Sequence, residues 1–192
     1  LSRTVLDSAM VFDAIRGSRD TDRYRAGATG SFVDAARREP GRLRIVTGEG
    51  QISEPVQGLP RVDARGQGGL LDVVISPDFA RDRMIYWSYA EPREGGNATS
   101  VARGRLSDDG ARVENVQVIF RALPVYDGDK HFGSSLAFAS DGKLFVTLGE
   151  RSDKPMRPQA QDLGSHMGKT IRINADGSNA REIPFTINDT AA

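Results

Sequence analysis

The sequence contains no cysteine, two histidines and one tryptophan among its 192 residues, and it carries no net charge. Without cysteine, disulfides, thiolate metal sites and a cysteine nucleophile are excluded. The 26 basic residues balance the 26 acidic ones, so nothing favours a nucleic-acid partner or a charged membrane surface. No apolar run approaches the roughly 20 residues that a membrane-spanning helix needs. The first residues show no signal-peptide pattern, so we expect neither a membrane span nor an export signal in this chain.

Turn-forming residues, in contrast, are frequent. The chain has 21 glycines and 9 prolines, with 38% hydrophobic and 27% charged residues, a balance typical of globular proteins. Gly, Pro and Asp recur between short apolar runs along most of the chain. This composition favours a β-rich fold over a helical bundle.

The first 40 residues differ from the rest and predict helices. Apolar residues from Val5 to Ala14 recur at three-to-four spacing and form one apolar face. Gly17 is a suitable C-terminal stop for this helix. A second short helix is predicted over 32–38, where Pro40 and Gly41 end it.

From Leu43 onward, short runs of β-branched and aromatic residues alternate with turn residues. Strands are predicted over 43–47, 69–75, 84–90, 100–106, 115–121, 134–139, 143–148 and 169–174. The pattern of 70–110 repeats over 136–177, an offset of roughly 65 residues. Repeated antiparallel units of this kind predict a mainly β fold whose blades are arranged around an axis, of which this chain supplies about two to two and a half.

Two glycine-rich motifs place polar residues at the entrances of predicted strands. The first, Gly66–Asp72, contains Gln67, and the second, Gly128–Leu136, contains Asp129 and His131. An imidazole titrates near neutral pH and can accept a proton, so His131 is a candidate catalytic base. The glycines let the backbone approach a ligand closely. Because both motifs stand at strand entrances, an all-β scaffold can direct them into one pocket.

Residues of about 41–178 resemble the soluble PQQ-dependent aldose sugar dehydrogenases, the glucose/sorbosone dehydrogenase family. The resemblance rests on motifs that follow one another in the family's order: Gly66–Asp72, Ser76–Phe79, Tyr86–Tyr89, Gly104–Ser107, Gly128–Leu136, Asp141–Val146, Gly149–Arg151, Gln159–Leu163 and Gly168–Lys169. It implies part of a six-bladed β-propeller. It also implies oxidation of aldose sugars at the anomeric carbon, with hydride transfer to pyrroloquinoline quinone (PQQ) and calcium as a second cofactor.

The same resemblance implies roles for individual residues. His131 corresponds to the catalytic base, and Gln67 and Asp129 to substrate-binding residues. An external electron acceptor and a periplasmic or secreted location are implied as well. Ser135 departs from the family, which usually has arginine there. The family's cofactor-binding and calcium-binding residues lie beyond the resemblance, so none is assigned here, and the isolated chain is expected to be an incomplete, inactive fragment.

Residues 1–45 resemble a non-catalytic segment of the amidase signature family, whose catalytic serines and lysine are not present. The sequence therefore predicts a helical amidase-like segment at 1–40, a partial propeller at 41–178 and an unassigned tail at 179–192. The string Pro40–Ile45 suits both families. We interpret the chain as a fusion or a chimera joined near this string.

Other residues have simpler interpretations than chemistry. His166 is expected to be a loop histidine, and Gly66–Gly69 lacks the spacing of a phosphate-binding loop. Tyr86, Trp87 and Tyr89 are expected to pack in the core rather than stack on sugar. Turn formation is favoured over calcium binding for the aspartates at 108, 109, 127, 129 and 141. For the whole chain, a non-catalytic β-propeller-like binding scaffold or an inactive chimeric fragment stays open as an alternative to an enzyme.

Overall fold

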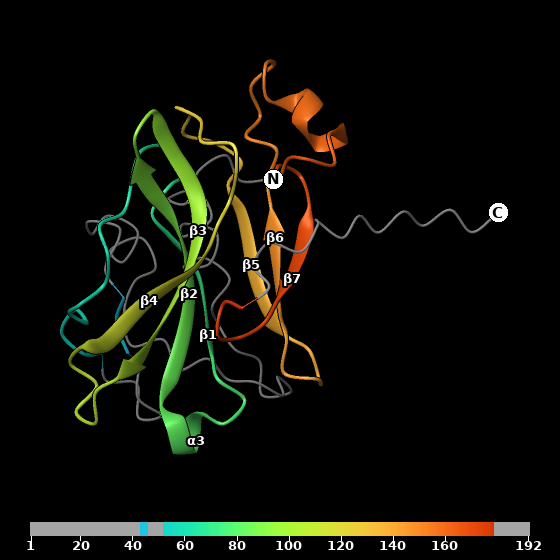
Figure 1. Ribbon diagram of the computed structural model, residues 1–192. Coiled ribbons are helices and arrows are strands. Elements are labelled where there is room, and N and C mark those ends of the chain that lie inside the picture. Colours follow the sequence, from blue (N-terminus) through green and yellow to red (C-terminus); the bar gives the residue numbers. More distant parts are fainter. Residues whose placement is uncertain (1–42, 46–51, 179–192) are drawn as a thin grey trace, which may run out of the picture. The chain divides into compact units, whose positions relative to one another are not determined.

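The computed structural model describes residues 43–45 and 52–178 (Figure 1). The chain divides into two units, Leu1–Pro55 and Val56–Ala192. The helices predicted within residues 1–40 and the tail at 179–192 lie outside the described residues.

The predicted strand at 43–47 is not formed in its described part, residues 43–45. Here the Ser53 backbone N–H donates to the Ile45 carbonyl oxygen at 2.9 Å. Ser53 Oγ accepts from the Ile45 N–H at 2.9 Å, and the Arg44 guanidinium donates to the Ser53 carbonyl oxygen at 2.7 Å. The polar groups of this segment are therefore bonded around one serine, and residues 43–45 join no sheet ladder.

The second unit contains a four-stranded antiparallel sheet. Its strands lie in the order β1 (Leu70–Ile75), β2 (Met84–Arg93), β3 (Gly96–Leu106) and β4 (Val113–Arg121), and the short helix α3 (Phe79–Asp82) joins β1 to β2. Gly95 has φ +82° in the tight β2–β3 hairpin, a left-handed conformation that favours glycine. Because this hairpin is so tight, β2 and β3 extend beyond their predicted bounds at 90 and 100.

A second antiparallel sheet follows, in the order β5 (Gly133–Phe138), β6 (Leu144–Leu148) and β7 (Thr170–Ile173). The predicted turn at Asp141 and Gly142 joins β5 to β6: Gly142 has φ +79°, and Asp141 Oδ1 accepts from the Lys143 N–H at 3.2 Å. A longer connection with the 3-10 helix η1 (Arg157–Gln161) separates β6 from β7.

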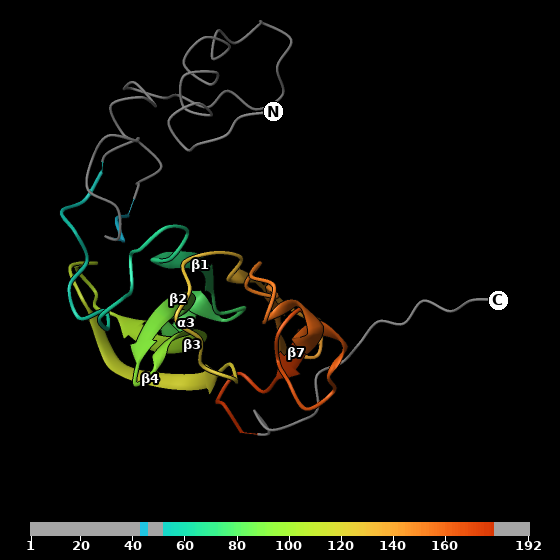
Figure 2. The same ribbon diagram turned by 90° about the horizontal axis from the view of Figure 1, so that it is seen from above.

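The two sheets lie side by side and share one apolar core (Figure 2). Its buried members come from β2, β3, β4 and the segment after it on one side and from all three strands of the second sheet on the other: Tyr86, Ala98, Val101, Ile119, Phe120, Ala122, Leu136, Leu144, Val146, Leu148, Ile171 and Ile173. Along β7, buried residues alternate with partly buried ones, as expected for a sheet with one face in the core. Each large apolar side chain buried in this way contributes roughly 1.5–3 kcal/mol.

The aromatic residues of β2 are buried, and Tyr86 belongs to this shared core. The Tyr86 ring stands edge-on to Phe138 with 5.0 Å between the ring centres, a favourable arrangement of two aromatic rings. Trp87 and Tyr89 are fully buried. The prediction that these side chains pack rather than stack on a sugar is confirmed.

The described fold is thus mainly β, built from two neighbouring antiparallel sheets. It confirms the predicted partial β-propeller, in which each sheet is a blade. Within the described residues, no helix has the length and apolar character that crossing a membrane requires.

Candidate active site

The two glycine-rich motifs meet, although they are more than sixty residues apart in the sequence. The Gln67 backbone N–H donates to the Asp129 carbonyl oxygen at 2.7 Å. In return, the His131 backbone N–H donates to the Gln67 side-chain oxygen Oε1 at 2.9 Å. All three residues that the sequence singled out, Gln67, Asp129 and His131, therefore lie in one pair of loops directly before β1 and β5.

Glycine is required where these loops approach other backbone. A Cβ atom at Gly66 would lie 2.5 Å from the Asp129 carbonyl oxygen and 2.6 Å from its carboxylate. At Gly149, just after β6, a Cβ atom would lie 1.9 Å from the His131 carbonyl oxygen. The loop that carries His131 is therefore enclosed by backbone on both sides, which fixes where it lies.

His131 forms a close polar pair with Glu150. The ring nitrogen Nδ1 lies 2.7 Å from Glu150 Oε1, and the side chains of His131 and Glu150 are 48% and 35% exposed. The hydrogen bond with His131 holds the pKa of Glu150 below its ordinary value, so the carboxylate is ionised at neutral pH. An ionised carboxylate only accepts hydrogen bonds, and Nδ1 must therefore carry the proton. In the neutral ring, Nε2 then keeps a lone pair that can accept a proton from a ligand.

Glu150 lies in the motif Gly149–Arg151, but no role was predicted for it. It reaches His131 because β5 and β6 are antiparallel and Gly133 pairs with Leu148. That pairing places the residues just after β6 beside those just before β5. The available signal was an acidic residue directly after a predicted strand whose neighbour strand begins at the histidine motif.

Two further side chains form hydrogen bonds to the backbone of the His131 loop. Arg151 and Asn97 are both buried, and both donate hydrogen bonds to the Gly128 carbonyl oxygen, at 2.7 and 2.8 Å. Asn97, Ala98 and Thr99 have the Asn-x-Thr spacing of an N-glycosylation acceptor. The buried, bonded amide of Asn97 is inaccessible to modification in the folded chain.

The second histidine has a structural environment. The Leu123 backbone N–H donates to His166 Nδ1 at 2.9 Å, and the His166 N–H donates to the Leu123 carbonyl oxygen at 2.9 Å. The ring stands edge-on to Phe120 with 5.1 Å between ring centres. Burial, with a smaller contribution from the charge of Lys169, holds the pKa of His166 below its ordinary value. The prediction of a loop histidine is confirmed.

The acidic residues form no metal site in the part of the chain that the structure describes: no three of its His, Asp or Glu side chains are grouped so that they could hold an ion. Asp109 Oδ1 accepts from the Ala111 N–H at 3.0 Å, and Asp141 bonds the backbone in the same way. Both are turn formers, as the sequence predicted. Asp127 instead pairs with Arg65 at 2.9 Å.

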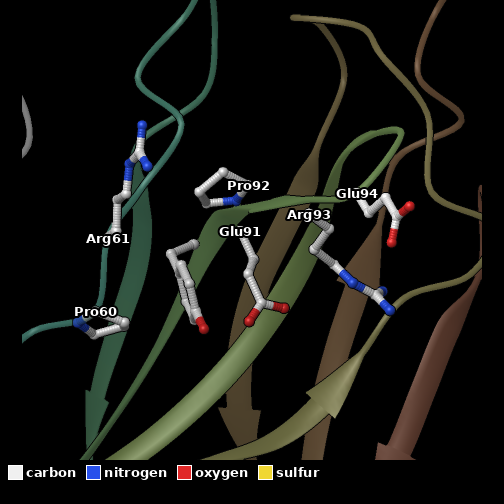
Figure 3. Close-up of a pocket in the computed structure, with 7 residues that line it drawn as sticks. Pro60, Arg61, Glu91, Pro92, Arg93 and Glu94 are labelled. Carbon is white, nitrogen blue, oxygen red and sulfur yellow. The ribbon is translucent and has the colours of Figure 1, made fainter.

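A pocket of about 450 Å³ lies near the end of β2 and does not include His131 (Figure 3). Its lining residues are Pro60, Arg61, Tyr89, Glu91, Pro92, Arg93 and Glu94. The Glu91 carboxylate already accepts from Arg121 at 2.8 Å and from Ser100 Oγ at 2.7 Å. In Figure 3 the Arg61 guanidinium points away from Glu91. Because the acid is already bonded within the protein, this pocket offers less reactive chemistry than the His131 loop.

Comparison with known proteins connects this geometry to one family. The family model described as Glucose / Sorbosone dehydrogenase matches residues 31–192. The aldose sugar dehydrogenase YliI of Escherichia coli (strain K12) is 44% identical over 146 residues, which cover 76% of this chain and 38% of that protein.

Solved structures agree with this match. The apo form of the soluble aldose sugar dehydrogenase from Escherichia coli superposes with a TM-score of 0.68 at 41% identity, over 78% of this chain and 42% of that one. The PQQ-bound form of an aldose sugar dehydrogenase from Streptomyces coelicolor superposes with a TM-score of 0.57 at 29% identity, over 67% of this chain and 36% of that one. The chain spans less than half the length of these relatives.

Proposed function

Because the chain belongs to the glucose/sorbosone dehydrogenase family, we propose that it carries the proton-accepting side of a PQQ-dependent aldose sugar dehydrogenase site. The observation that carries the proposal is the 2.7 Å pair of His131 Nδ1 and Glu150 Oε1. It leaves Nε2 of an accessible imidazole as a proton acceptor. Oxidation of a sugar at the anomeric carbon needs such an acceptor for the hydroxyl proton.

PQQ, when bound in such a site, supplies the hydride acceptor. His131 Nε2 takes the proton of the anomeric hydroxyl as the carbonyl forms. The imidazolium produced keeps its Nδ1–H bonded to Glu150, and the carboxylate stabilises the new positive charge. A well-placed general base of this kind contributes roughly 10²–10⁴-fold in rate.

Gln67 and Asp129 are proposed to bind the substrate. Gln67 Oε1 already accepts from the His131 N–H, which leaves the Nε2 amide group to donate to a sugar hydroxyl. Asp129 is held by its backbone against Gln67 at 2.7 Å, and its carboxylate can accept from a second hydroxyl. The two side chains therefore offer complementary hydrogen bonds, a donor and an acceptor, from two loops that contact each other.

The described residues fit the reacting side of a PQQ site rather than its cradle. Lys130 is an exposed cation next to His131, whereas PQQ carries several carboxylates that need more than one positive partner. Among residues 43–45 and 52–178, no three His, Asp or Glu side chains are grouped so that they could hold calcium, and no step is assigned to that ion. An aldose substrate, an external electron acceptor and a periplasmic or secreted location follow from the family and are part of the proposal.

A graft tests the proposal without requiring the isolated chain to be active. The matched residues of this chain would replace their counterparts in the Escherichia coli aldose sugar dehydrogenase, and dye reduction would be measured with an aldose, PQQ and calcium. We expect the graft to be active, and His131→Gln to lower its rate at least 10²-fold. The matched control is His166→Asn, because His166 is bonded to Leu123 and not to the His131 loop.

Two outcomes would contradict the proposal. A graft that folds and binds PQQ but does not oxidise aldoses would favour the non-catalytic scaffold or the inactive fragment. If the His131→Gln variant of the graft stays fully active, His131 is not the base. The isolated chain is expected to show no turnover under the same conditions, because its described residues lack a cofactor cradle.

A further inference from the structure

Arg151 is the most deeply buried cation near the candidate site. The residue as a whole is 1% exposed. Burying a guanidinium is costly unless its N–H groups are bonded. Arg151 Nη2 donates to the Gly128 carbonyl oxygen at 2.7 Å and to Asn97 Oδ1 at 2.6 Å, while Nε donates to the Lys130 carbonyl oxygen at 3.0 Å. Neutral oxygens therefore solvate this charge, and two of them lie just before His131.

Arg151 also contacts the chain after His131. Its guanidinium carbon lies 4.0 Å from the centre of the Phe132 ring, within the range of a cation–π contact. Its backbone N–H donates to the His131 carbonyl oxygen at 3.3 Å. One residue thus holds the backbone on both sides of His131, while the imidazole is bonded to Glu150.

The His131 loop needs such support. His131 has φ +45°, in the left-handed region that non-glycine residues rarely occupy. A residue in this conformation is retained only where its surroundings fix it. Gln67 contributes two bonds to the loop, at Asp129 and His131, and Arg151 contributes three, at Gly128, Lys130 and His131.

Arg151 further connects the loop to the first sheet. Asn97, in β3, accepts from Arg151 and donates to the Gly128 carbonyl oxygen at 2.8 Å and to Asp63 Oδ2 at 2.8 Å. Asp63 in turn is paired with Arg65 at 2.7 Å. Hydrogen bonds through Asn97 therefore anchor the loop to strand β3 as well as to its neighbours in sequence.

We propose that Arg151 is a positioning residue for the base: its planar guanidinium holds the His131 loop so that the imidazole Nδ1 stays on Glu150. The importance of this role for turnover rests on the proposed function of His131. Glu150 and Arg151 are consecutive, so one segment bonds the ring through Glu150 and the backbone beneath it through Arg151. The planar arrangement of N–H donors in the Arg151 guanidinium matters more than its charge, because the single ammonium group of a lysine cannot reach the same separated acceptors.

Arg151→Lys in the whole chain tests this proposal, since it keeps the positive charge and removes the guanidinium. Arg83→Lys is the matched control: Arg83 also donates to two backbone carbonyl oxygens, of Leu106 and Ser107, at 3.0 and 2.8 Å, and lies over the Phe79 ring. It stands beside α3, which Figure 1 shows at the bottom of the first sheet, while the segment between β4 and β5 runs at the top. The readouts are the ring ¹⁵N shifts of His131, which report its tautomer, and the ¹³C titration of the Glu150 carboxyl.

We expect the wild-type chain and Arg83→Lys to keep the Nδ1–H tautomer. In Arg151→Lys, the Nδ1–H fraction should fall by at least half, and Glu150 should titrate nearer its ordinary pKa. A folded Arg151→Lys chain with wild-type signals would overturn the proposal. If that variant does not fold, Phe132→Leu removes only the ring contact, and a smaller change of the same kind is expected; unchanged signals there would overturn the proposal equally.

Measurements on the graft distinguish this proposal from the proposed function. We expect Arg151→Lys to lower the rate of an active graft at least tenfold, and Arg83→Lys to leave it unchanged. Signals that change in an inactive graft would support the positioning role and contradict the sugar dehydrogenase. Activity with unmoved signals would support the enzyme and contradict the role of Arg151.

Discussion

The loops that carry the two histidines precede strands of the same sheet, yet they stabilise opposite tautomers of the neutral imidazole. Before β5, the ionised Glu150 carboxylate requires a proton on His131 Nδ1, so Nε2 is the free acceptor. Before β7, the Leu123 N–H occupies Nδ1 of His166 at 2.9 Å, so the neutral ring carries its proton on Nε2.

This contrast shows that the partner, and not the residue type, decides what a histidine can do. His131 is accessible and has an anionic partner that would stabilise a proton taken from a ligand. His166 is half-buried against Phe120, beside the positive charge of Lys169, where a second proton is disfavoured. One ring can exchange a proton with a ligand, and the other holds a loop together.

The largest expected effect comes from changing the partner of His131. In Glu150→Gln, the amide NH₂ can donate to Nδ1 and stabilise the form of the ring found at His166. We expect the rate of the active graft to fall about 10³-fold, because Nε2 then carries the proton it should accept. Ring ¹⁵N shifts should show the change of tautomer. Glu150→Asp keeps the carboxylate and should lose less; equal losses in both variants would mean that the tautomer is not what matters.

A smaller effect is expected from replacing a glycine at each of the two histidine loops with alanine. Gly149→Ala places a Cβ 1.9 Å from the His131 carbonyl oxygen, a backbone atom that cannot move aside easily. We expect a loss of about 2 kcal/mol in the free energy of unfolding, measured in urea. In the His166 loop, the Cβ of Gly164→Ala meets only the Asp162 side chain at 3.2 Å. That variant should stay within about 0.5 kcal/mol of the wild type, and similar losses for both would contradict the close packing of the His131 loop.

Much of the fold followed from local sequence signals. The predicted strands from residue 69 onward all overlap observed ones, because their alternating or continuous apolar runs end at glycine turns such as Gly142. The extension of β2 and β3 to a hairpin was missed, since Glu91–Gly96 is polar and contains a proline and two glycines. Those residues form ladder pairs such as Arg93 with Gly96, which tertiary pairing stabilises and local propensity does not reveal.

The candidate site was predicted in part. The Gln67 and His131 loops are in contact, as expected of two motifs that stand at strand entrances, and the pocket that they were expected to share stays a prediction. Glu150 and Arg151 were recognised in a motif but given no role, since their partners depend on which strands pair and which side chains become buried. The substrate-binding roles of Gln67 and Asp129, the amidase-like segment and the chimera interpretation stay predictions.

The smallest expected effect is a pH dependence of stability that His166 adds. Burial holds the pKa of His166 below the ordinary value of 6.5, so the unfolded chain binds a proton there before the folded chain does. The contribution of the neutral ring to stability is therefore complete above pH 6.5 and is lost as the pH falls toward the folded pKa. We expect the wild type to lose about 1 kcal/mol between pH 8 and pH 5.5 relative to His166→Asn, which offers a similar acceptor to Leu123 but does not titrate. Parallel pH profiles in urea unfolding would mean that the folded environment of His166 does not disfavour the protonated ring, and the contrast between the two rings would then rest on Glu150 alone.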